Sequence, residues 1–385
     1  MPKVYHLLPE AEVFSEFDGG AISRWVANVL RNDVAGMVAA CSSDTTWGFD
    51  AARILTLPAL ISYQRWQDRS RRRMPWMLRK LLLKRIFKRL TALLKPGDVV
   101  WVHNRPEFAA ALGQDTHRAG ARLVLHMHNS HLLTANPKII RDLELDASVF
   151  VSRYLKEETC GKHPRFLDGT VLYNGADDCI FFPVNRERRD ESSPITVVFA
   201  SRVVPEKGPA VLAEALRCLL KRGVPVEGMI VGGAQFGSSE PTEYVRELIR
   251  SAPPNLHFHP YCVGKQLADL LREADIFCLP STWQEPLSMA TLEAMATGLP
   301  VVATRSGGIP EALLYGGGVL VERGSVEELA SAIERLVFDP ILRRKLGGEA
   351  FSSFVDHFRW ATVVENYQAI VDRTISQAPE YANHA

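Results

Sequence analysis

Two glutamates with seven residues between them, Glu285 and Glu293, stand out in the second half of the sequence. An apolar run ends shortly before them, and a helix is predicted to start after Pro286. Carboxylate oxygens accept hydrogen bonds from hydroxyl groups such as those of sugars, and the free amides at a helix N-terminus bind phosphate. The predicted helix begins with Leu287, Ser288 and Met289, whose amides would contact the phosphate. The segment therefore predicts a site for both parts of a nucleotide sugar.

The elements around this segment follow a repeating pattern. Short apolar runs alternate with longer amphipathic segments, which is typical of parallel βαβ units. In the first half, strands are predicted at residues 4–8, 36–40, 99–102, 122–127, 147–151 and 169–173. In the second half, they are predicted at residues 195–200, 228–231, 256–258, 276–279, 300–303 and 317–321. Each half therefore predicts a doubly wound α/β sheet, and both glutamates lie near a carboxyl edge, where such sheets bind ligands. In the ordinary alternative, Glu293 is a solvated helix residue and Glu285 a helix cap.

The length of 385 residues also favours two domains. A polar, charged and proline-bounded segment, residues 182–194, separates the two halves and suits an exposed linker. We place the boundary near residue 186, which gives an N-terminal domain of residues 1–185 and a C-terminal domain of residues 186–358.

Composition excludes several classes of protein. The chain is 46% hydrophobic and 23% charged, as in folded globular proteins, and it contains no apolar run long enough for a membrane span and no signal-peptide pattern. Its six cysteines are scattered, which indicates a reducing compartment. We expect a cytoplasmic protein.

The glutamate segment and the residues after it carry a resemblance to a known family. With the Gly-Gly-Ile-Pro-Glu run at residues 307–311, it closely resembles the signature of family-four retaining glycosyltransferases of GT-B fold, of the bacterial lipopolysaccharide, capsule and cell-surface glycan type. The resemblance implies two Rossmann-like domains with an interdomain cleft and a nucleoside diphosphate sugar as donor. It also implies retention of anomeric configuration without a metal ion or cofactor. Glu285 would then bind sugar hydroxyls, and Glu293 the ribose.

The resemblance extends to other parts of the donor site. Arg202 and Lys207 look like the cations that the family places on the donor pyrophosphate. Fixed cations stabilise a departing diphosphate most in the transition state, although two such residues are more often surface charges. Gly232 resembles the glycine turn beside the nucleotide, and Tyr261 and Val263 fall where the family holds the base through main-chain atoms.

The N-terminal half adds two motifs. Gly19 and Gly20 resemble the family's diglycine loop, which precedes a helix and lets the backbone approach a phosphate. His128 resembles the histidine that contacts the donor sugar near the reacting carbon. Strand alternation puts His126 on the same face, so the choice between them stays open.

These histidines have other interpretations. They can be buried histidines with satisfied hydrogen bonds, or His126, His128 and His131 can form a metal site, with His257 and His259 as a second pair. Neither group has a carboxylate or cysteine at metal-ligand spacing, so we predict no metal. An amphipathic helix over residues 359–376 resembles the family's C-terminal helix, which returns to complete the first domain.

Charge is concentrated in one segment. Residues 65–95 hold twelve basic residues against one acidic residue, whereas the whole chain has a net charge of +1. A helix from Pro75 would have an apolar side beside its cations, as in a helix that lies on anionic lipid. We predict an anionic membrane surface as a partner for Arg65 to Lys95; the alternative is a core-facing helix with a solvated basic face. No recognisable nucleic-acid module is present. The predicted apolar side comprises Met77, Leu78, Leu81, Leu82, Ile86 and Leu90.

The sequence therefore predicts a peripheral enzyme of the cytoplasmic membrane face. It would move a sugar from a UDP-sugar, or from a GDP-sugar, to a lipid-linked or cell-surface glycan acceptor. Two alternatives are a nucleotide-sugar epimerase or hydrolase of the same fold and a non-catalytic sugar-nucleotide-binding protein. The acceptor side is expected near His103, Asn104, Arg105 and Glu107.

Overall fold

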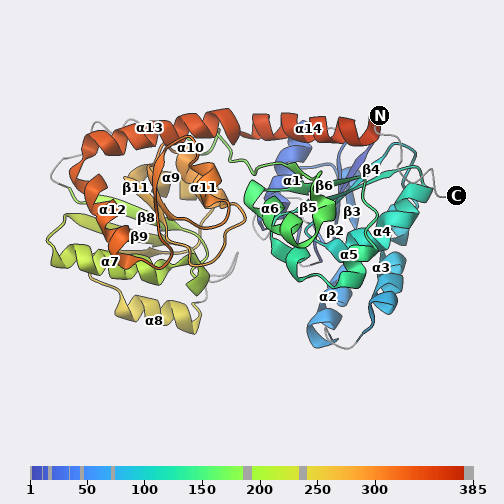
Figure 1. Cartoon of the computed structure of the whole chain (residues 1–385), viewed down its shortest axis with the longest axis horizontal. Helices are drawn as coiled ribbons and strands as arrows, with labels where there is room; N and C mark the ends of the chain where they lie inside the picture. Colours follow the sequence, from blue (N-terminus) through green and yellow to red (C-terminus); the bar gives the residue numbers. More distant parts are fainter. Residues whose placement is uncertain are drawn as a thin grey trace. The chain divides into compact units, whose positions relative to one another are not determined.

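The computed structural model divides the chain into two compact units (Figure 1). Unit 1 comprises Met1–Tyr173 with Val364–Ala385, and unit 2 comprises Asn174–Val363. The structure describes residues 2–10, 12–15, 20–33, 35–43, 47–70, 74–184, 193–233 and 241–376. Each unit is built on its own parallel sheet, as predicted for a GT-B chain.

The sheet of unit 1 has seven parallel strands in the order β3-β2-β1-β4-β5-β6-β7. The order reverses between β1 and β4, so the carboxyl ends of these two strands flank the point where such sheets bind ligands. The strands are β1 (Val4–Leu7), β2 (Met37–Ala40), β3 (Ile54–Thr56), β4 (Val99–His103), β5 (Arg122–Met127), β6 (Ala147–Phe150) and β7 (Thr170–Val171).

Buried aromatic residues fill the core of unit 1. Trp25 and Trp101 are completely buried and stack with their ring centroids 6.4 Å apart. Tyr367, near the end of the chain, packs against Trp101 at 5.0 Å, so the C-terminal helix completes this core. The helices are α1 (Ala21–Asn32), α2 (Ala59–Ser70), α3 (Trp76–Thr91), α4 (Pro106–Arg118), α5 (Pro137–Arg141), α6 (Arg153–Lys162) and α14 (Trp360–Ser376).

The sheet of unit 2 has six parallel strands in the order β10-β9-β8-β11-β12-β13. Its order reverses between β8 and β11. The strands are β8 (Ile195–Ala200), β9 (Val226–Val231), β10 (Leu256–His259), β11 (Ile276–Leu279), β12 (Val301–Thr304) and β13 (Gly318–Val321). The helices are α7 (Pro209–Lys221), α8 (Glu243–Ser251), α9 (Lys265–Glu273), α10 (Met289–Ala296), α11 (Ile309–Ala312), α12 (Val326–Phe338) and α13 (Pro340–His357).

The contacts divide the chain ahead of the predicted boundary near residue 186, which itself lies outside the described residues. The segment after Tyr173 belongs to unit 2 because it is bound there. Ala176 pairs with Arg359, and Arg272 Nη2 donates a hydrogen bond of 2.9 Å to the Ile180 carbonyl. The predicted helix over 359–376 is present as α14, and the division falls within it, before Val364.

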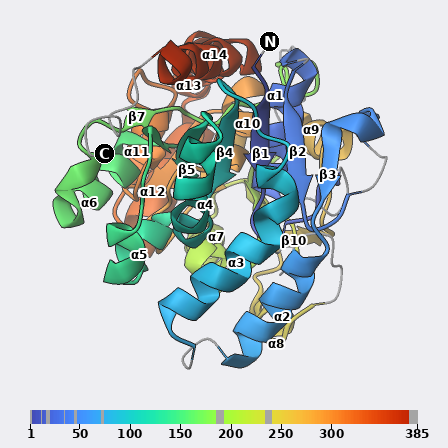
Figure 2. The same ribbon diagram turned by 90° about the vertical axis from the view of Figure 1, so that its right-hand side faces the viewer.

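The basic helix α3 buries a side that shares only Leu90 with the predicted apolar side. The helix begins after Pro75 as expected, but it buries Trp76, Leu83, Phe87 and Leu90. This side packs on α4 (Figure 2). The rings of Phe87 and Phe108 lie edge to face there, with their centroids 5.0 Å apart. Because α3 places this side against α4, a different set of its apolar residues faces outward. Met77, Leu78 and Leu81 are 59%, 54% and 60% exposed.

Candidate active site

Loops that leave β8 and β11 meet at the carboxyl edge of the unit 2 sheet. These strands flank its switch point, where ligands bind in open α/β sheets. Arg202 and Lys207 follow β8, and Glu285 follows β11. The structure brings Lys207 and Glu285 into direct contact: the Lys207 Nζ atom lies 2.6 Å from Oε1 and 2.8 Å from Oε2 of Glu285.

Glu285 is buried and held from several sides. Its carboxylate is 2% exposed, and its Oε1 atom accepts hydrogen bonds from the Ser281 hydroxyl at 2.7 Å and from Trp283 Nε1 at 2.9 Å. Oε2 accepts from Lys207 alone among the described residues. A carboxylate oxygen has two lone pairs, so Oε2 can accept a further hydrogen bond from a hydroxyl group.

The glycine pair at 307 and 308 fixes the backbone of Glu285. The amide of Gly308 donates a hydrogen bond of 2.7 Å to the Glu285 carbonyl. Gly307 has a φ of 56°, and a Cβ atom there would lie 1.9 Å from the same carbonyl oxygen. Only glycine fits this position, which explains physically why the Gly-Gly run follows the glutamate segment.

Lys207 is positioned by a tight turn. The backbone of Gly208 is left-handed, with a φ of 73°, and a Cβ atom there would lie 1.9 Å from the Pro280 carbonyl oxygen. The β8 and β11 loops are joined again where the Thr282 amide donates to the Glu206 carbonyl at 2.9 Å. Since the Lys207 side chain is only 12% exposed and lies 5.6 Å from the Trp283 ring centroid, its charge is fixed in a largely dry site.

Helix α10 supplies the other predicted contacts. Ser288 caps it by accepting a hydrogen bond of 3.3 Å from the Thr291 amide. The first amides of a helix have no intrahelical acceptor, so the α10 N-terminus can bind an anion after the Glu285 loop. Glu293 lies further along α10. The pKa of the nearby Cys262 thiol is raised first by burial and second by the negative charge of Glu293. Glu293 is therefore next to the loop of Tyr261 and Val263.

Gly232 ends β9 beside the β8 loop. Its φ is 149°, and a Cβ atom would lie 2.0 Å from the Ser201 carbonyl oxygen. This close approach requires glycine. It also places the backbone after β9 next to the segment that carries Arg202, which is half-buried.

In unit 1, the N-terminus of α1, where the sequence predicts a phosphate contact, binds the carboxylate of Glu12. Gly20 precedes the helix as its N-cap, whereas Gly19 lies outside the described residues. The Glu12 carboxylate accepts a hydrogen bond of 3.0 Å from the Ser23 amide, and burial raises its pKa. Sequence reasoning missed Glu12, because nothing in its spacing shows that it returns to the helix end.

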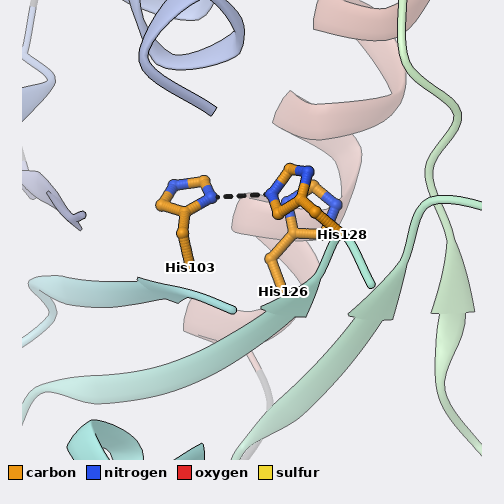
Figure 3. A group of neighbouring side chains, drawn as sticks. All are labelled: His103, His126 and His128. Atoms are coloured by element: carbon orange, nitrogen blue, oxygen red, sulfur yellow. Dashed lines mark hydrogen bonds between the residues drawn. The ribbon is translucent and has the colours of Figure 1, made fainter. Parts of the chain in front are cut away.

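His128 is half-buried and lies after β5, beside the buried His103 and His126 (Figure 3). The ring nitrogens of His103, His126 and His128 lie within 4.8 Å of one another, and His103 Nδ1 is 3.0 Å from His128 Nε2. His131, a member of the predicted alternative metal site, instead contacts Arg105 at 3.0 Å. Burial lowers the pKa of His128 to about 3, so this imidazole is neutral at physiological pH.

Comparison with known proteins identifies the family of one domain. Residues 183–352, which lie in unit 2, match the family described as Glycosyl transferases group 1. The chain therefore contains a group 1 glycosyltransferase domain, and its fold is of the GT-B type. It is 27% identical to spore coat protein SA of Bacillus subtilis, over 72% of this chain and 78% of that one. It is 26% identical to a GDP-mannose-dependent mannosyltransferase of Corynebacterium glutamicum, over 71% and 76% of the two chains.

Solved structures agree with the GT-B fold of this chain. HepE of Anabaena was solved with UDP and glucose and has a TM-score of 0.72 at 18% identity. The match covers 97% of this chain and 100% of the HepE chain. Sucrose-phosphate synthase of Thermosynechococcus elongatus has a TM-score of 0.73 at 18% identity, over 98% and 100% of the two chains. At this level of identity, the likeness shows the fold. None of the described helices is both long and apolar enough to span a bilayer.

The group 1 domain positions Glu285 with residues to which the sequence analysis assigned no role. Ser281 and Trp283 both bind its carboxylate, yet the only signal for them is that they belong to the same segment. The predicted roles of Lys207 and Glu285 were separate, on diphosphate and sugar, whereas here the two side chains form one ion pair.

Proposed function

We propose that this glycosyltransferase transfers a sugar, with retention of anomeric configuration and without a metal ion, from a nucleoside diphosphate sugar to a lipid-linked or cell-surface glycan. The observation that carries the proposal is the buried Lys207–Glu285 pair at the switch point of the unit 2 sheet. A fixed cation and a carboxylate in contact can bind the two adjacent parts of a donor, its phosphate and its sugar.

Lys207 acts on the leaving group in this proposal. As the glycosidic bond breaks, negative charge grows on the diphosphate, and a cation held in a dry site stabilises that charge without first having to reorient. Arg202 and the α10 N-terminus contribute further positive potential at the same sheet edge. The protein's own charges then do what a metal ion does in other transferases.

Glu285 and Glu293 hold the rest of the donor. Oε2 of Glu285 has capacity for a sugar hydroxyl, since Lys207 is its one described donor and the Ser281 and Trp283 donors are both on Oε1. Glu293 binds the ribose, and Tyr261 and Val263 hold the base through their backbone. The acceptor hydroxyl attacks the face from which the diphosphate departs and transfers its proton to a phosphate oxygen, so no side chain has to act as the base.

A UDP-sugar is our first choice of donor and a GDP-sugar the second. HepE, which shares this fold, was solved with UDP, and the Corynebacterium relative is named for GDP-mannose. The test is to incubate the enzyme with radiolabelled UDP-glucose or GDP-mannose, a bacterial lipid extract and EDTA. We expect label in lipid or glycan, with the donor's anomeric configuration by NMR.

The other outcomes of this assay identify the alternatives. Free labelled sugar would indicate a hydrolase, and an epimeric nucleotide sugar would indicate an epimerase. A thermal shift with nucleotide sugar but no turnover would indicate a binding protein. Activity that EDTA abolishes and zinc or magnesium restores would contradict the metal-free mechanism.

We further propose that α3 attaches unit 1 to the cytoplasmic face of an anionic membrane. Its outward residues Met77, Leu78 and Leu81 are more than half exposed, and Arg85, Lys88 and Arg89 are exposed on the same helix. Apolar side chains that enter the headgroup region beside cations are typical of an interfacial helix. Each cation near the surface contributes about 1 kcal/mol before screening by salt.

Vesicle sedimentation tests this attachment. Changing Arg85, Lys88 and Arg89 to Glu should release the protein from phosphatidylglycerol vesicles, whereas wild type should sediment with them and not with phosphatidylcholine vesicles. A matched charge change in unit 2, of the exposed residues Lys265, Arg344 and Lys345 to Glu, is the control. Equal release by both triple variants would show a general charge effect and contradict a specific role for α3.

A further inference from the structure

A continuous run of hydrogen-bonded side chains crosses the interior of unit 1. Tyr367 Oη contacts Asp33 Oδ2 at 3.2 Å and His6 Nε2 at 3.1 Å. His6 Nδ1 contacts His103 Nε2 at 3.1 Å, and His103 Nδ1 contacts His128 Nε2 at 3.0 Å. The run therefore joins the end of α1 to the residue after β5, through a tyrosine from α14.

Asp33 fixes the direction of hydrogen bonding at one end. Its Oδ1 atom accepts from the amides of Ala35 and Gly36, both at 3.0 Å, and its Oδ2 atom accepts from Tyr367. A carboxylate can only accept. Tyr367 keeps its proton, because burial and the adjacent Asp33 raise its pKa well above the usual value. Its hydroxyl proton therefore points to Asp33, and its oxygen must accept from His6.

This direction passes through each imidazole in turn. A neutral imidazole has one N–H donor and one acceptor nitrogen. If His6 donates from Nε2 to Tyr367, its Nδ1 accepts from Nε2 of His103. The Nδ1 atom of His103 then accepts from Nε2 of His128. The run ends at an unprotonated Nδ1 on His128, for which no hydrogen bond to another described residue is found.

The imidazoles satisfy the condition of neutrality. Burial lowers the pKa of both His6 and His128 to about 3 and that of His103 well below its usual range. Each ring therefore carries a single proton at physiological pH. Trp25 packs against His103 with ring centroids 5.4 Å apart, which restricts rotation of that ring.

We infer that Asp33, Tyr367, His6 and His103 are positioning residues that hold His128 as its Nε2–H tautomer and so present Nδ1 as a hydrogen-bond acceptor to a substrate hydroxyl. The substrate part of this inference rests on the proposed function, in which His128 contacts the donor sugar. The assignment of the His128 tautomer does not rest on the proposed function. His126 stands beside the run, its ring centroid 4.0 Å from that of His128, and neither of its nitrogens has a partner among the described residues (Figure 3).

A metal ion held by His103, His126 and His128 is the competing use of these rings, since their nitrogens lie close together. A metal would take the lone pairs that join His103 to His128 and would leave no reason for the continuation to His6, Tyr367 and Asp33. The hydrogen-bonded run accounts for each contact from His128 through to Asp33, and for this reason we favour it.

Asp33→Asn is a sharp test of the direction. The two backbone amides at Oδ1 keep the amide oxygen of Asn on that side, so its NH2 group replaces Oδ2 and donates to Tyr367. Tyr367 must then donate to His6, and every tautomer in the run inverts. The tautomers are measured by a long-range proton–nitrogen NMR correlation on ligand-free protein with ¹⁵N-labelled histidine. The His128 signal is the one that disappears in the His128→Gln variant.

We expect His128 to be protonated at Nε2 in wild type and at Nδ1 in Asp33→Asn. Tyr367→Phe interrupts the run and should give a mixture of both tautomers. Tyr63→Phe removes another buried hydroxyl of unit 1 that lies outside the run and should leave the wild-type tautomer. Protonation of Nδ1 in wild type, or no change in Asp33→Asn while the thermal midpoint is kept, would overturn the inference.

Activity measurements separate this inference from the proposed function. Asp33→Asn and Tyr367→Phe should each lower kcat/KM by about threefold to tenfold, the usual effect of one hydrogen bond to substrate, whereas Tyr63→Phe should not. If the tautomers invert in Asp33→Asn but kcat/KM is unchanged, the run does not act on the substrate. If the tautomers are as expected but wild type transfers no sugar, the proposed function fails and the run stands. One equivalent of zinc in the purified protein would establish the metal site instead.

Discussion

The two units use the same strand order and place an ion pair at the same point, but with opposite polarity. In unit 2, the cation Lys207 follows the first strand and the carboxylate Glu285 follows the fourth. In unit 1, the carboxylate Glu10 follows the first strand and the cation Arg105 follows the fourth, with Arg105 Nε 2.5 Å from Glu10 Oε2. The topology therefore fixes where a site can form, and the residues decide what it binds.

The surroundings of the two pairs differ as much as their polarity. Around Glu285 are donors that leave one of its oxygens available, next to the start of α10. Beside Arg105 are a histidine and a run of neutral imidazoles. Unit 2 thus holds fixed charge suited to a diphosphate, whereas unit 1 holds uncharged donors and acceptors suited to hydroxyl groups. We take the first pair to be functional and the second to be structural, and this difference can be tested.

The largest expected effect is that of Lys207→Met. Removing a preorganised cation from a site where charge develops should lower kcat by about 100-fold to 1000-fold. Turnover of the labelled donor is the measurement. Arg222→Met, which breaks exposed ion pairs with Glu327 and Glu334 in the same unit, is the matched control and should keep full activity. A kcat for Lys207→Met within threefold of the wild-type value would contradict the view that the unit 2 ion pair is functional and the unit 1 ion pair structural.

Acid should destabilise unit 1 before unit 2. The pKa values of His6 and His128, about 3, lie below the ordinary value of 6.5, so the unfolded chain takes up protons that the folded chain does not. Stability is therefore complete above about pH 6.5 and falls as the pH drops toward 3, by about 1.4 kcal/mol per pH unit for each of these histidines. Hydrogen exchange measured by mass spectrometry at pH 7.5 and 5.5 reports each unit separately.

The expected pattern is faster exchange at pH 5.5, after correction for intrinsic rates, in peptides from β1, β4 and β5 but not in those from β8 and β11. His6→Gln should make the dependence on pH shallower. Equal loss of protection in both units would mean that the buried histidines do not set the acid response.

Most of the fold could be predicted because its strands are buried apolar runs. The runs at 122–127, 195–200 and 276–279 became strands with the predicted bounds. The strand Ile54–Thr56 was missed, since three residues at a sheet edge carry too little pattern. The predicted apolar side of α3 shares only Leu90 with the buried side, because apolar residues occur around most of that helix and its contact with α4 decides which of them are buried.

The candidate site was predictable only as far as its contacts are local in sequence. Glu285 was found through the residues beside it, and the glycine pair at 307 and 308 proved to hold its carbonyl. The contacts of Tyr367 with His6, 361 positions away, could not be found in this way. No spacing rule predicts them, since they depend on how Tyr367 of α14 packs against His6 of β1 and Trp101 of β4.

Arg105→Met should affect stability rather than donor binding. It leaves the Glu10 carboxylate, which is 3% exposed, without its cation, at a cost of about 2 kcal/mol. We expect a lower thermal midpoint but an unchanged thermal shift with UDP. The double variant Arg105→Met, Glu10→Gln should recover part of the loss. If Arg105→Met instead weakened UDP binding tenfold at constant stability, the pair in unit 1 would be functional as well.

The smallest expected effect is that of Glu293→Ala. If Glu293 binds the ribose, its loss should weaken UDP by about tenfold, or 1.4 kcal/mol, and lower turnover at limiting donor. Calorimetric titration with UDP and with 2′-deoxy-UDP measures this. The deoxy nucleotide should bind wild type as weakly as UDP binds the variant, because each lacks one partner of the same hydrogen bond. If Glu293→Ala still discriminated between the two nucleotides as wild type does, the ribose would be held elsewhere, and only the phosphate and sugar contacts of unit 2 would remain in our assignment.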